Sequence, residues 1–305
     1  MKRIIITGDD FGLALPVNEA IEQAHRFGIL TAASLMVGAA ASDDAAERAR
    51  RLPTLRVGLH LVLVEGRPVL PPEQVPGLVD GRGEFPTRLG RAGFNFFFRT
   101  SVRRELEAEI RAQFEAFKRT GLCMDHVNSH NHMHVHPTVL GLILKVGREY
   151  GMRAVRLPFE PALLSWRVTR RQLGRKLSSA LLLSPWLGLM RVRLRRAGIR
   201  TNDRVIGMAD SGMMTAARVL EYLKRLPGGI TEIYFHPATQ RCPEITRNMP
   251  DYRHEDEFKA LIDPAVSDGL VQAGVRRISF ADLWDDAAPA GRPDRPAGQH
   301  GAPGF

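Results

Sequence analysis

Short β-rich runs alternate with helical patterns along nearly the whole chain, and this alternation constrains the fold more than any other feature. The runs with strand composition are RIIIT, ILTAASLMV, RVGLHLV, MDHVNSH, MRAVRLP, RVIGM, ITEIYFHP and VRRISF. Neighbouring parallel strands need a long crossover connection, usually a helix, so strands that alternate with helices indicate a parallel sheet. The seven or eight strand–helix units therefore predict an α/β fold, an irregular, TIM-like β/α barrel.

The chain is long enough for one large domain. At 305 residues it can bury a full-sized core, and we expect a single barrel domain over residues 1–285. Residues 161–202 contain no acid and are interpreted as a basic helical insertion in that domain. Residues 286–305 are rich in Ala, Pro and Gly, which predicts a flexible tail.

The basic surplus of the sequence is concentrated in one segment. The formal net charge is +10, and residues 166–200 hold ten Lys and Arg around an apolar centre. This pattern has two interpretations of equal weight, and the first is peripheral contact with an anionic membrane surface. The alternative is a helical hairpin that packs its apolar face on the barrel or on a dimer partner. The apolar centre is too short and too interrupted by proline to span a bilayer, and no nucleic-acid-binding signature accompanies the charge.

Two features of the sequence indicate the cellular compartment. The apolar run at the N-terminus is too short for an export signal. The two cysteines, Cys123 and Cys242, form no disulfide framework. We therefore expect a cytoplasmic protein, peripheral at the inner membrane face if the basic segment binds lipid.

The first strand runs into an acidic pair flanked by glycines, in the order Gly8-Asp9-Asp10-Phe11-Gly12. Adjacent carboxylates repel each other unless a cation or a shared proton relieves them, so a metal site is one explanation. The alternative is a solvated turn or a helix cap, where Asp is common. On a β/α barrel, catalytic groups lie at the carboxyl ends of strands, which is where this pair stands.

Histidines mark two further strand ends. In RVGLHLV, His60 lies on the face opposite a row of bulky apolar residues, so it projects into the barrel mouth if that row packs on the helices. The alternative is a core histidine bonded to a main-chain carbonyl. The stretch DHVNSHNHMHVHP holds five histidines, too many for one catalytic metal, and both His130 and His134 are possible ligands. An adventitious metal tract or a pH-sensing cluster is the other interpretation.

Other polar residues are candidates on position alone. His236 closes ITEIYFHP just before a proline, a place that suits a catalytic acid or base. Two weaker candidates for contact with substrate are Gln113, in an amphipathic helix, and Arg156, at the end of another strand. His134 is a third such candidate if His130 binds the metal.

Together, the order and spacing of TGDDFG, GLHL, HVNSHNHMH and FHP resemble the YdjC or ChbG-type carbohydrate deacetylase family over most of the chain. The variant HVNSHNHMHVHP resembles the hopanoid-associated branch called HpnK. The resemblance implies an irregular β/α barrel, one divalent metal ion held by one Asp and two His, and hydrolysis of the N-acetyl group of an amino sugar. It also implies a homodimer and, in the HpnK branch, a lipid-linked (hopanoid) N-acetylglucosamine as substrate.

Carried onto this sequence, the resemblance makes Asp10, His60 and His130 the metal ligands, Asp9 the general base and His236 the acid beside the leaving amine. Such a set agrees with the chemistry of amide hydrolysis, because a metal polarises the carbonyl while a base and an acid move protons. Zinc, magnesium and manganese all accept a His/His/Asp set completed by water.

One position departs from the wider family. Asn128 stands two residues before His130, where many relatives have Asp. An amide cannot act as a carboxylate. If this position orients a ligand histidine, the site binds metal more weakly or relies on another group.

Two other functions fit parts of the sequence. A metal-dependent phosphoesterase on a similar barrel would also use His and Asp at strand ends, but it would need further carboxylates for a second metal, and these motifs have few. A non-enzymatic basic protein that binds membranes or nucleic acid would explain the charge. It would leave the acidic pair and the histidines unexplained.

Overall fold

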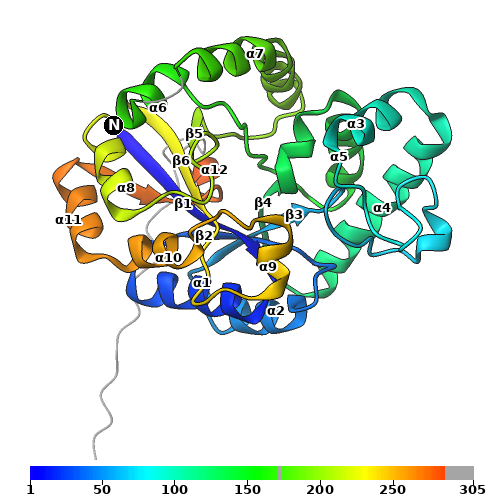
Figure 1. The fold of residues 1–305 in the computed structure, drawn as a ribbon, viewed down its shortest axis with the longest axis horizontal. Coiled ribbons are helices and arrows are strands. Elements are labelled where there is room, and N and C mark those ends of the chain that lie inside the picture. Colours follow the sequence, from blue (N-terminus) through cyan, green and yellow to red (C-terminus); the bar gives the residue numbers. More distant parts are fainter. Residues whose placement is uncertain (171–172, 286–305) are drawn as a thin grey trace, which may run out of the picture.

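A computed structural model describes residues 1–170 and 173–285, so the expected tail, 286–305, lies outside the described residues. The centre of the described chain is a parallel sheet of seven strands (Figure 1). The strands are β1 (Lys2–Phe11), β2 (Ala32–Leu35), β3 (Arg56–Leu61), β4 (Met124–Ser129), β5 (Arg204–Ile206), β6 (Gly229–Phe235) and β7 (Val275–Ile278). Their order is β4-β3-β2-β1-β6-β5, and β7 also pairs with β1.

Helices connect the strands and cover the outside of the sheet. They are α1 (Leu15–Phe27), α2 (Ser42–Arg50), α3 (Leu89–Phe98), α4 (Thr100–Arg119), α5 (Pro137–Glu149), α6 (Ala162–Thr169), α7 (Leu173–Arg196), α8 (Ala216–Leu223), α9 (Pro243–Asn248), α10 (His254–Ile262), α11 (Pro264–Gln272) and α12 (Asp282–Asp285), with 3-10 turns η1 (Pro72–Gln74) and η2 (His130–Val135). In Figure 1, α1 and α2 lie on one side of the sheet and α6 and α7 on the opposite side. The expected α/β class, a parallel sheet with helices outside it, is confirmed.

The strand β1 is the centre of the sheet and has three partners. It pairs with β6 from Lys2 to Gly8, with β7 from Lys2 to Ile5, and with β2 from Thr7 onward. Its residues Ile4, Ile5 and Ile6 are almost fully buried. A parallel strand covered on both faces has a continuous apolar run, which is why RIIIT predicts it well.

Irregular chain replaces one expected strand between β4 and β5. The run MRAVRLP, residues 152–158, forms only two isolated parallel bridges, Val127 with Val155 and Ala154 with Arg200. Pro158 has no N–H to donate, and the amide of Val205 bonds the carbonyl of Phe159 at 2.8 Å instead. The prediction of a regular strand here is wrong. The sheet is curled, and irregular chain links β4 to β5.

The basic segment forms helices α6 and α7, with Arg171 outside the described residues. Several apolar side chains of α7 are exposed: Leu177, Leu181, Leu182, Trp186, Leu189 and Val192. Arg191 and Arg193 turn back onto the protein and donate to the main-chain carbonyls of Asp203 and Pro137. Among the described helices, none combines the length and the apolar character needed to cross a membrane.

Candidate functional site

The carboxyl ends of β1, β3, β4 and β6 meet at a cavity of about 280 Å³. Its lining includes Asp9, His60, His130 and His236, four of the residues singled out by the sequence. Parallel strands place their carboxyl ends at one edge of the sheet, which brings together residues that are more than two hundred positions apart in the chain. The structure thus gathers the acidic pair, His60, part of the histidine-rich stretch and His236 around one space.

A distortion of β1 turns both acids toward this edge. Successive side chains of a regular strand point to opposite faces, so adjacent Asp9 and Asp10 would normally diverge. The pairing of β1 with β2 shifts register between Gly8 and Phe11, and Asp10 has a φ of 62°. Bulges re-aim side chains, and a left-handed backbone at a residue other than glycine is strained. This strain lies at the residue that the sequence nominates as a metal ligand.

Asp10, His60 and His130 form the one compact group of potential metal-binding side chains found in the described chain. Asp10 Oδ1 lies 3.3 Å from His60 Nε2 and 3.3 Å from His130 Nδ1. One donor atom from each residue lies within 4.8 Å of the others, and all three residues are buried. The structure therefore brings together the three ligands that the sequence nominates.

The facing atoms of Asp10 and His60 lack hydrogen-bond partners. Both carboxylate oxygens of Asp10 and the Nε2 atom of His60 are buried without a hydrogen bond. A buried polar atom without a partner is costly, and a divalent cation would satisfy all of these atoms at once. One carboxylate and two imidazoles are a common donor set for zinc and for other divalent metals with water. The residues present fit such an ion.

The electrostatics of the cluster also favour a positive charge. Burial would lower the pKa of His130, but Asp10 and Glu65 more than reverse this and raise it to about 10. Burial would raise the pKa of Asp10, yet His130 and His60 hold it well below its usual range. Glu65 Oε2 lies 3.6 Å from His130 Nε2. A proton or a metal ion can meet this demand for positive charge.

Asn128 holds the ligand candidate His60 in position. The Nδ1–H of His60 donates to Asn128 Oδ1 at 2.7 Å, and this bond directs Nε2 at Asp10. The amide nitrogen of Asn128 donates to Ser34 Oγ at 2.9 Å and to Asp9 Oδ1 at 3.3 Å. The amide therefore does orient a histidine, and it adds two donated hydrogen bonds that a carboxylate could not make.

Arg156 holds Asp9. Its guanidinium donates to Asp9 at 2.5 and 3.0 Å and to Glu232 at 2.7 and 2.9 Å, and all three residues are buried. Burial would raise the pKa of Asp9, but the charge of Arg156 outweighs this and holds that pKa well below its usual range. Thr7 donates to Glu232 at 2.8 Å, and the Tyr234 ring lies 4.6 Å from the guanidinium carbon. Arg156 therefore contacts Asp9 and Glu232 from inside the protein, and it is absent from the cavity lining.

His236 lines the cavity between two tyrosine rings, with centroids 5.5 Å from Tyr234 and 5.1 Å from Tyr252. Its main-chain N–H donates to Glu257 at 2.6 Å, while its Nδ1 is buried without a hydrogen bond. Burial lowers the pKa of His236 to about 4. The imidazole is thus neutral at pH 7 and has a nitrogen free to exchange a proton.

Two candidates from the sequence lie away from the cluster. The Gln113 side chain bonds both main-chain groups of Val62, at 2.9 and 2.7 Å, and does not line the cavity. His134 has both ring nitrogens engaged, by Ser129 Oγ at 2.7 Å and the Arg156 carbonyl at 3.0 Å. Of the two possible metal ligands in the histidine-rich stretch, only His130 faces Asp10.

Several polar neighbours of the cluster were not predicted from the sequence. Glu65 and Asn131 have φ of 55° and 51°, and Asn131 donates to Glu65 at 2.8 Å beside His130. No motif marks Glu65, which follows β3 in irregular chain. Ser34 and Glu232 lie inside apolar strands, where a lone polar residue is the only available signal.

Fold and site together define an α/β protein with a buried carboxylate–histidine pocket at the carboxyl ends of parallel strands. Within that class, the chain belongs to the YdjC-like protein family, whose profile matches residues 3–272. A carbohydrate deacetylase of Geobacillus stearothermophilus is 30% identical over 92% of this chain and 97% of its own length. One of Brevibacillus brevis is 41% identical, but over only 52% of this chain and 60% of its own length.

One solved structure is similar across nearly the whole fold. It is a protein of Enterococcus faecalis provisionally named a cellobiose-phosphate cleavage protein, with a TM-score of 0.70 and 26% identity. The alignment covers 92% of this chain and 98% of that one. The family expected from the motifs is therefore confirmed.

Proposed function

We propose that this protein removes the N-acetyl group from an amino sugar with the help of one divalent metal ion. The observation that supports this most is the cluster of Asp10, His60 and His130, because the carboxylate of Asp10 and Nε2 of His60 are buried without hydrogen-bond partners. The relatives named carbohydrate deacetylases support the reaction class.

Each residue has a proposed part in the hydrolysis. When bound by Asp10, His60 and His130, the ion would polarise the acetyl carbonyl and lower the pKa of a water molecule. Asp9 accepts the proton of the attacking water, and Arg156 keeps its carboxylate ionised and fixed in direction. His236 passes a proton to the departing nitrogen. Because its pKa is lowered to about 4, His236 must acquire that proton during turnover.

One assay separates this function from its main rival. The purified protein is incubated with N-acetylglucosaminyl compounds and with a generic phosphoester, with and without a chelator, and released acetate and phosphate are measured. We expect acetate release that the chelator abolishes and that zinc, magnesium or manganese restores. Release of phosphate without acetate would identify a phosphoesterase and contradict the proposal.

The ligand assignment has its own test. Asp10→Ala, His60→Ala and His130→Ala should each lose bound metal and activity while the far-ultraviolet circular dichroism stays that of the wild type. The matched control is His132→Ala, because His132 lines the cavity without belonging to the cluster. Full metal occupancy in His130→Ala, measured by atomic spectroscopy, would remove His130 from the ligand set.

The substrate we propose is lipid-linked, a hopanoid N-acetylglucosamine, which would place the chain in the HpnK branch. A second cavity of about 300 Å³ supports this, because it is lined largely by apolar residues such as Phe159, Leu183 and Leu187. Met208 lines both cavities, so an apolar group could lie beside the reacting sugar. The exposed apolar side chains of α7 support peripheral membrane contact through residues 166–200.

We also propose a cytoplasmic homodimer, and the free cysteines Cys123 and Cys242 suit a reducing compartment.

Sedimentation with anionic liposomes tests the membrane contact. We expect binding that falls as salt rises. The informative variant is Leu181→Ser with Leu182→Ser, since both side chains are exposed, whereas Arg191 and Arg193 also bond main-chain carbonyls. This variant should bind less while it still hydrolyses a short water-soluble substrate. Wild-type protein that stays in the supernatant at low salt would contradict the idea.

A further inference from the structure

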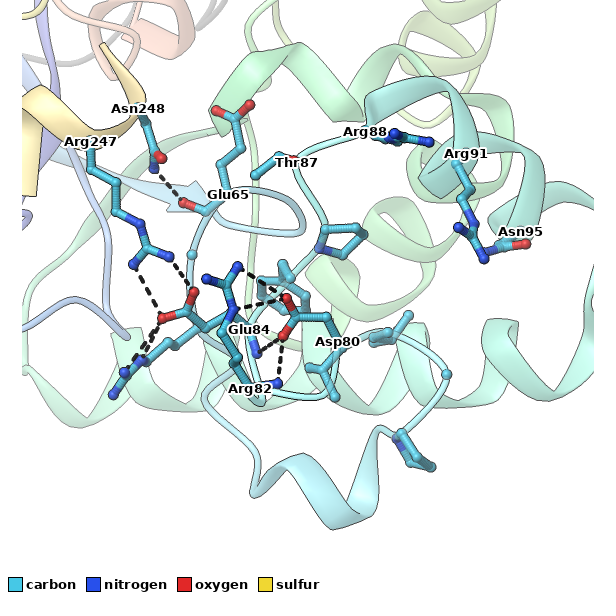
Figure 2. A pocket seen from close by; sticks show the side chains of 18 of the residues that line it. Glu65, Asp80, Arg82, Glu84, Thr87, Arg88, Arg91, Asn95, Arg247 and Asn248 are labelled. Atoms are coloured by element: carbon cyan, nitrogen blue, oxygen red, sulfur yellow. Dashed lines mark hydrogen bonds and ion pairs between the residues drawn. The ribbon is translucent and has the colours of Figure 1, made fainter. Parts of the chain in front are cut away.

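Two groups of polar residues adjoin the candidate metal cluster. One lies beside the cavity, where the main-chain carbonyl of Glu65 accepts from the Asn248 amide at 2.9 Å (Figure 2). The second lies inside the sheet and has no part in the proposed reaction. It comprises Ser34 on β2 with Asp125 and His126 on β4, and all three are almost completely buried. Burial of a carboxylate and an imidazole is costly unless their hydrogen bonds are satisfied.

The second group forms a linear hydrogen-bond network with Asn128, which we call the buried network. Asp125 Oδ2 lies 2.9 Å from His126 Nδ1, and His126 Nε2 lies 3.0 Å from Ser34 Oγ. Ser34 Oγ accepts in turn from the Asn128 amide at 2.9 Å, and Asn128 Oδ1 accepts from His60 Nδ1 at 2.7 Å. Four consecutive hydrogen bonds thus link Asp125 to a candidate metal ligand.

Gly58 allows the buried network to cross the sheet. Strand β3 lies between β2 and β4, and Gly58 of β3 pairs in register with Ser34. A Cβ atom on Gly58 would lie 2.5 Å from His126 Nδ1, a separation that real Cβ atoms do not show. Because glycine has no side chain, the His126 ring occupies this space and reaches Ser34 across β3. The ring also stacks on Phe280, with centroids 4.6 Å apart, so its position is fixed.

The hydrogen bonds of the buried network run in one direction. A carboxylate only accepts, so the Nδ1–H of His126 donates to Asp125. The neutral ring then accepts at Nε2 from the Ser34 hydroxyl, whose oxygen accepts from the Asn128 amide. The carbonyl oxygen of Asn128 consequently faces His60 and can only accept, which requires a proton on His60 Nδ1. A metal ion binds a histidine nitrogen that carries no proton.

We propose that the buried network sets which nitrogen of His60 carries the proton and so keeps Nε2 available to the metal ion. Asp125, His126 and Ser34 are then positioning residues, which act on the ligand through Asn128. The inference rests on the proposed metal-dependent function and adds three residues to the site.

Asp125→Asn reverses the start of the buried network. The main-chain N–H of Ala281 donates to Asp125 Oδ1 at 2.8 Å, so the amide of the variant keeps its oxygen there. Its NH₂ group must then face His126 Nδ1, which has to accept. The other ring nitrogen of His126 becomes an N–H that donates to Ser34.

The reversal is passed on to His60. Of the described residues, only His126 and Asn128 bond the Ser34 hydroxyl, so its proton can now go only to Asn128. The Asn128 amide then turns over and presents NH₂ to His60 Nδ1. Its 3.3 Å bond to Asp9 opposes this turn, so we expect a mixture of the two orientations in Asp125→Asn.

Nitrogen-15 NMR of the metal-free protein tests the proton position directly. The chemical shift distinguishes a ring nitrogen with a proton from one without, and the His60 signals are those absent from His60→Gln. We expect His60 Nδ1 to be protonated in the wild type and partly unprotonated in Asp125→Asn. Ser34→Ala, which removes the hydroxyl, supplies the same comparison if Asp125→Asn does not fold. Full protonation of Nδ1 in both variants would overturn the proposal.

Zinc affinity, measured by competition calorimetry, tests the consequence for the metal. Asp125→Asn should raise the Kd for zinc about tenfold, as the loss of a partner of a ligand histidine does. In the Asn128→Leu background the buried network no longer reaches His60, so the same change should leave the Kd unaltered. An equal factor in both backgrounds would show that Asp125 does not act through Asn128, which also overturns the proposal.

Tyr222→Phe is the matched control. It also removes a buried hydrogen bond, from the Tyr222 hydroxyl to Asp210 at 2.6 Å, on α8 outside the buried network. It should lower Tm and leave both the His60 proton and the zinc Kd as in the wild type. The same result in Asp125→Asn would assign the buried network to stability alone. A wild type that binds none of zinc, magnesium and manganese would contradict the proposed function, while NMR still decides the inference.

Discussion

Asn128 determines how His60 presents its nitrogen to the candidate metal cluster. It accepts the Nδ1–H of His60 at 2.7 Å and donates to Asp9 at 3.3 Å, so it stands between a proposed ligand and the proposed base. A carboxylate in its place could still accept from His60. It would also add a negative charge next to Asp9 in a buried site. The amide is thus suited to a site that already contains an acidic pair.

Substitutions of Asn128 can separate its hydrogen bond to His60 from the effect of its lack of charge on Asp9. Asn128→Asp should keep bound metal, because a carboxylate oxygen can still orient His60. Its charge should raise the pKa of Asp9, which moves the acidic limb of the kcat profile to higher pH. Asn128→Leu removes the acceptor and should weaken metal affinity about 10- to 100-fold, the usual effect of losing such a partner. Unchanged affinity in Asn128→Leu would show that the hydrogen bond to His60 does not position it.

The proposed base can be tested apart from the ligands. Asp9→Asn should keep the metal yet lose a factor of about 10² to 10⁴ in turnover, the usual contribution of general acid–base catalysis. His236→Ala should behave similarly. Arg156→Lys should lower kcat with little change in KM, since lysine cannot make the paired contacts that fix Asp9. Near-normal turnover in metal-loaded Asp9→Asn would remove Asp9 from the mechanism.

At the scale of elements, the sequence predicts those strands whose runs are mainly apolar and β-branched or aromatic. RIIIT, ITEIYFHP and RVGLHLV correspond to β1, β6 and β3. Pairing register is not visible in such runs, although it makes His60 and Asn128 direct neighbours across β3 and β4. The reversal of φ at Asp10 is equally hidden, because only the completed site stabilises it. The sequence therefore nominated the three clustered residues but not Asn128 as the partner of His60.

Long-range packing accounts for the other differences. Arg156 was expected near substrate because it closes a strand-like run, yet it is fully buried between Asp9 and Glu232. The helix α3 was not predicted because Gly90 and Gly93 lower the helix propensity of RLGRAGFNFFF, and its Phe94 and Phe98 are exposed. Neither position follows from local composition.

The irregular chain before α6 contains a pH-sensitive carboxyl. Burial raises the pKa of Glu160 from its usual 4.5 to about 7, and one of its oxygens has no partner. The folded state therefore holds this proton more tightly than the unfolded state, and its stabilising effect is present below pH 4.5 and lost as pH rises through 7. Wild-type Tm should fall across this window more than that of Glu160→Gln.

The comparison of the two proteins isolates Glu160 from other titrating groups. At pH 8 the Glu160→Gln protein should unfold about 1–2 °C above the wild type, the shift for roughly 1 kcal/mol in a protein of this size. At pH 4.5 the two should have similar Tm values. The same difference in Tm at both pH values would show that ionisation of Glu160 is not the cause.

For the whole molecule, metal binding should couple to unfolding because the cluster joins β1, β3 and the start of η2. A ligand that binds only the folded state stabilises it by about 2.7 kcal/mol at a hundred times its Kd. Zinc, magnesium or manganese added to chelator-treated protein should therefore raise Tm by several degrees, measured by scanning calorimetry. Asp10→Asn should show no such rise. An equal rise in both proteins would place the bound metal elsewhere.

The pairing of β1 also sets an order of events during synthesis. Lys2 pairs with Gly229 and with Val275, so the strand that carries the acidic pair is translated long before two of its three neighbours. At about 5–20 residues per second, the ribosome needs on the order of ten seconds or more to supply them. Until then, the edge of β1 that β6 covers in the folded protein stays open, and an open edge on an apolar strand favours aggregation. A nascent chain stopped before β6 would already contain the strands that carry Asp10, His60 and His130, yet it would lack the strand that pairs with the other edge of β1 and leads to His236 at the same cavity.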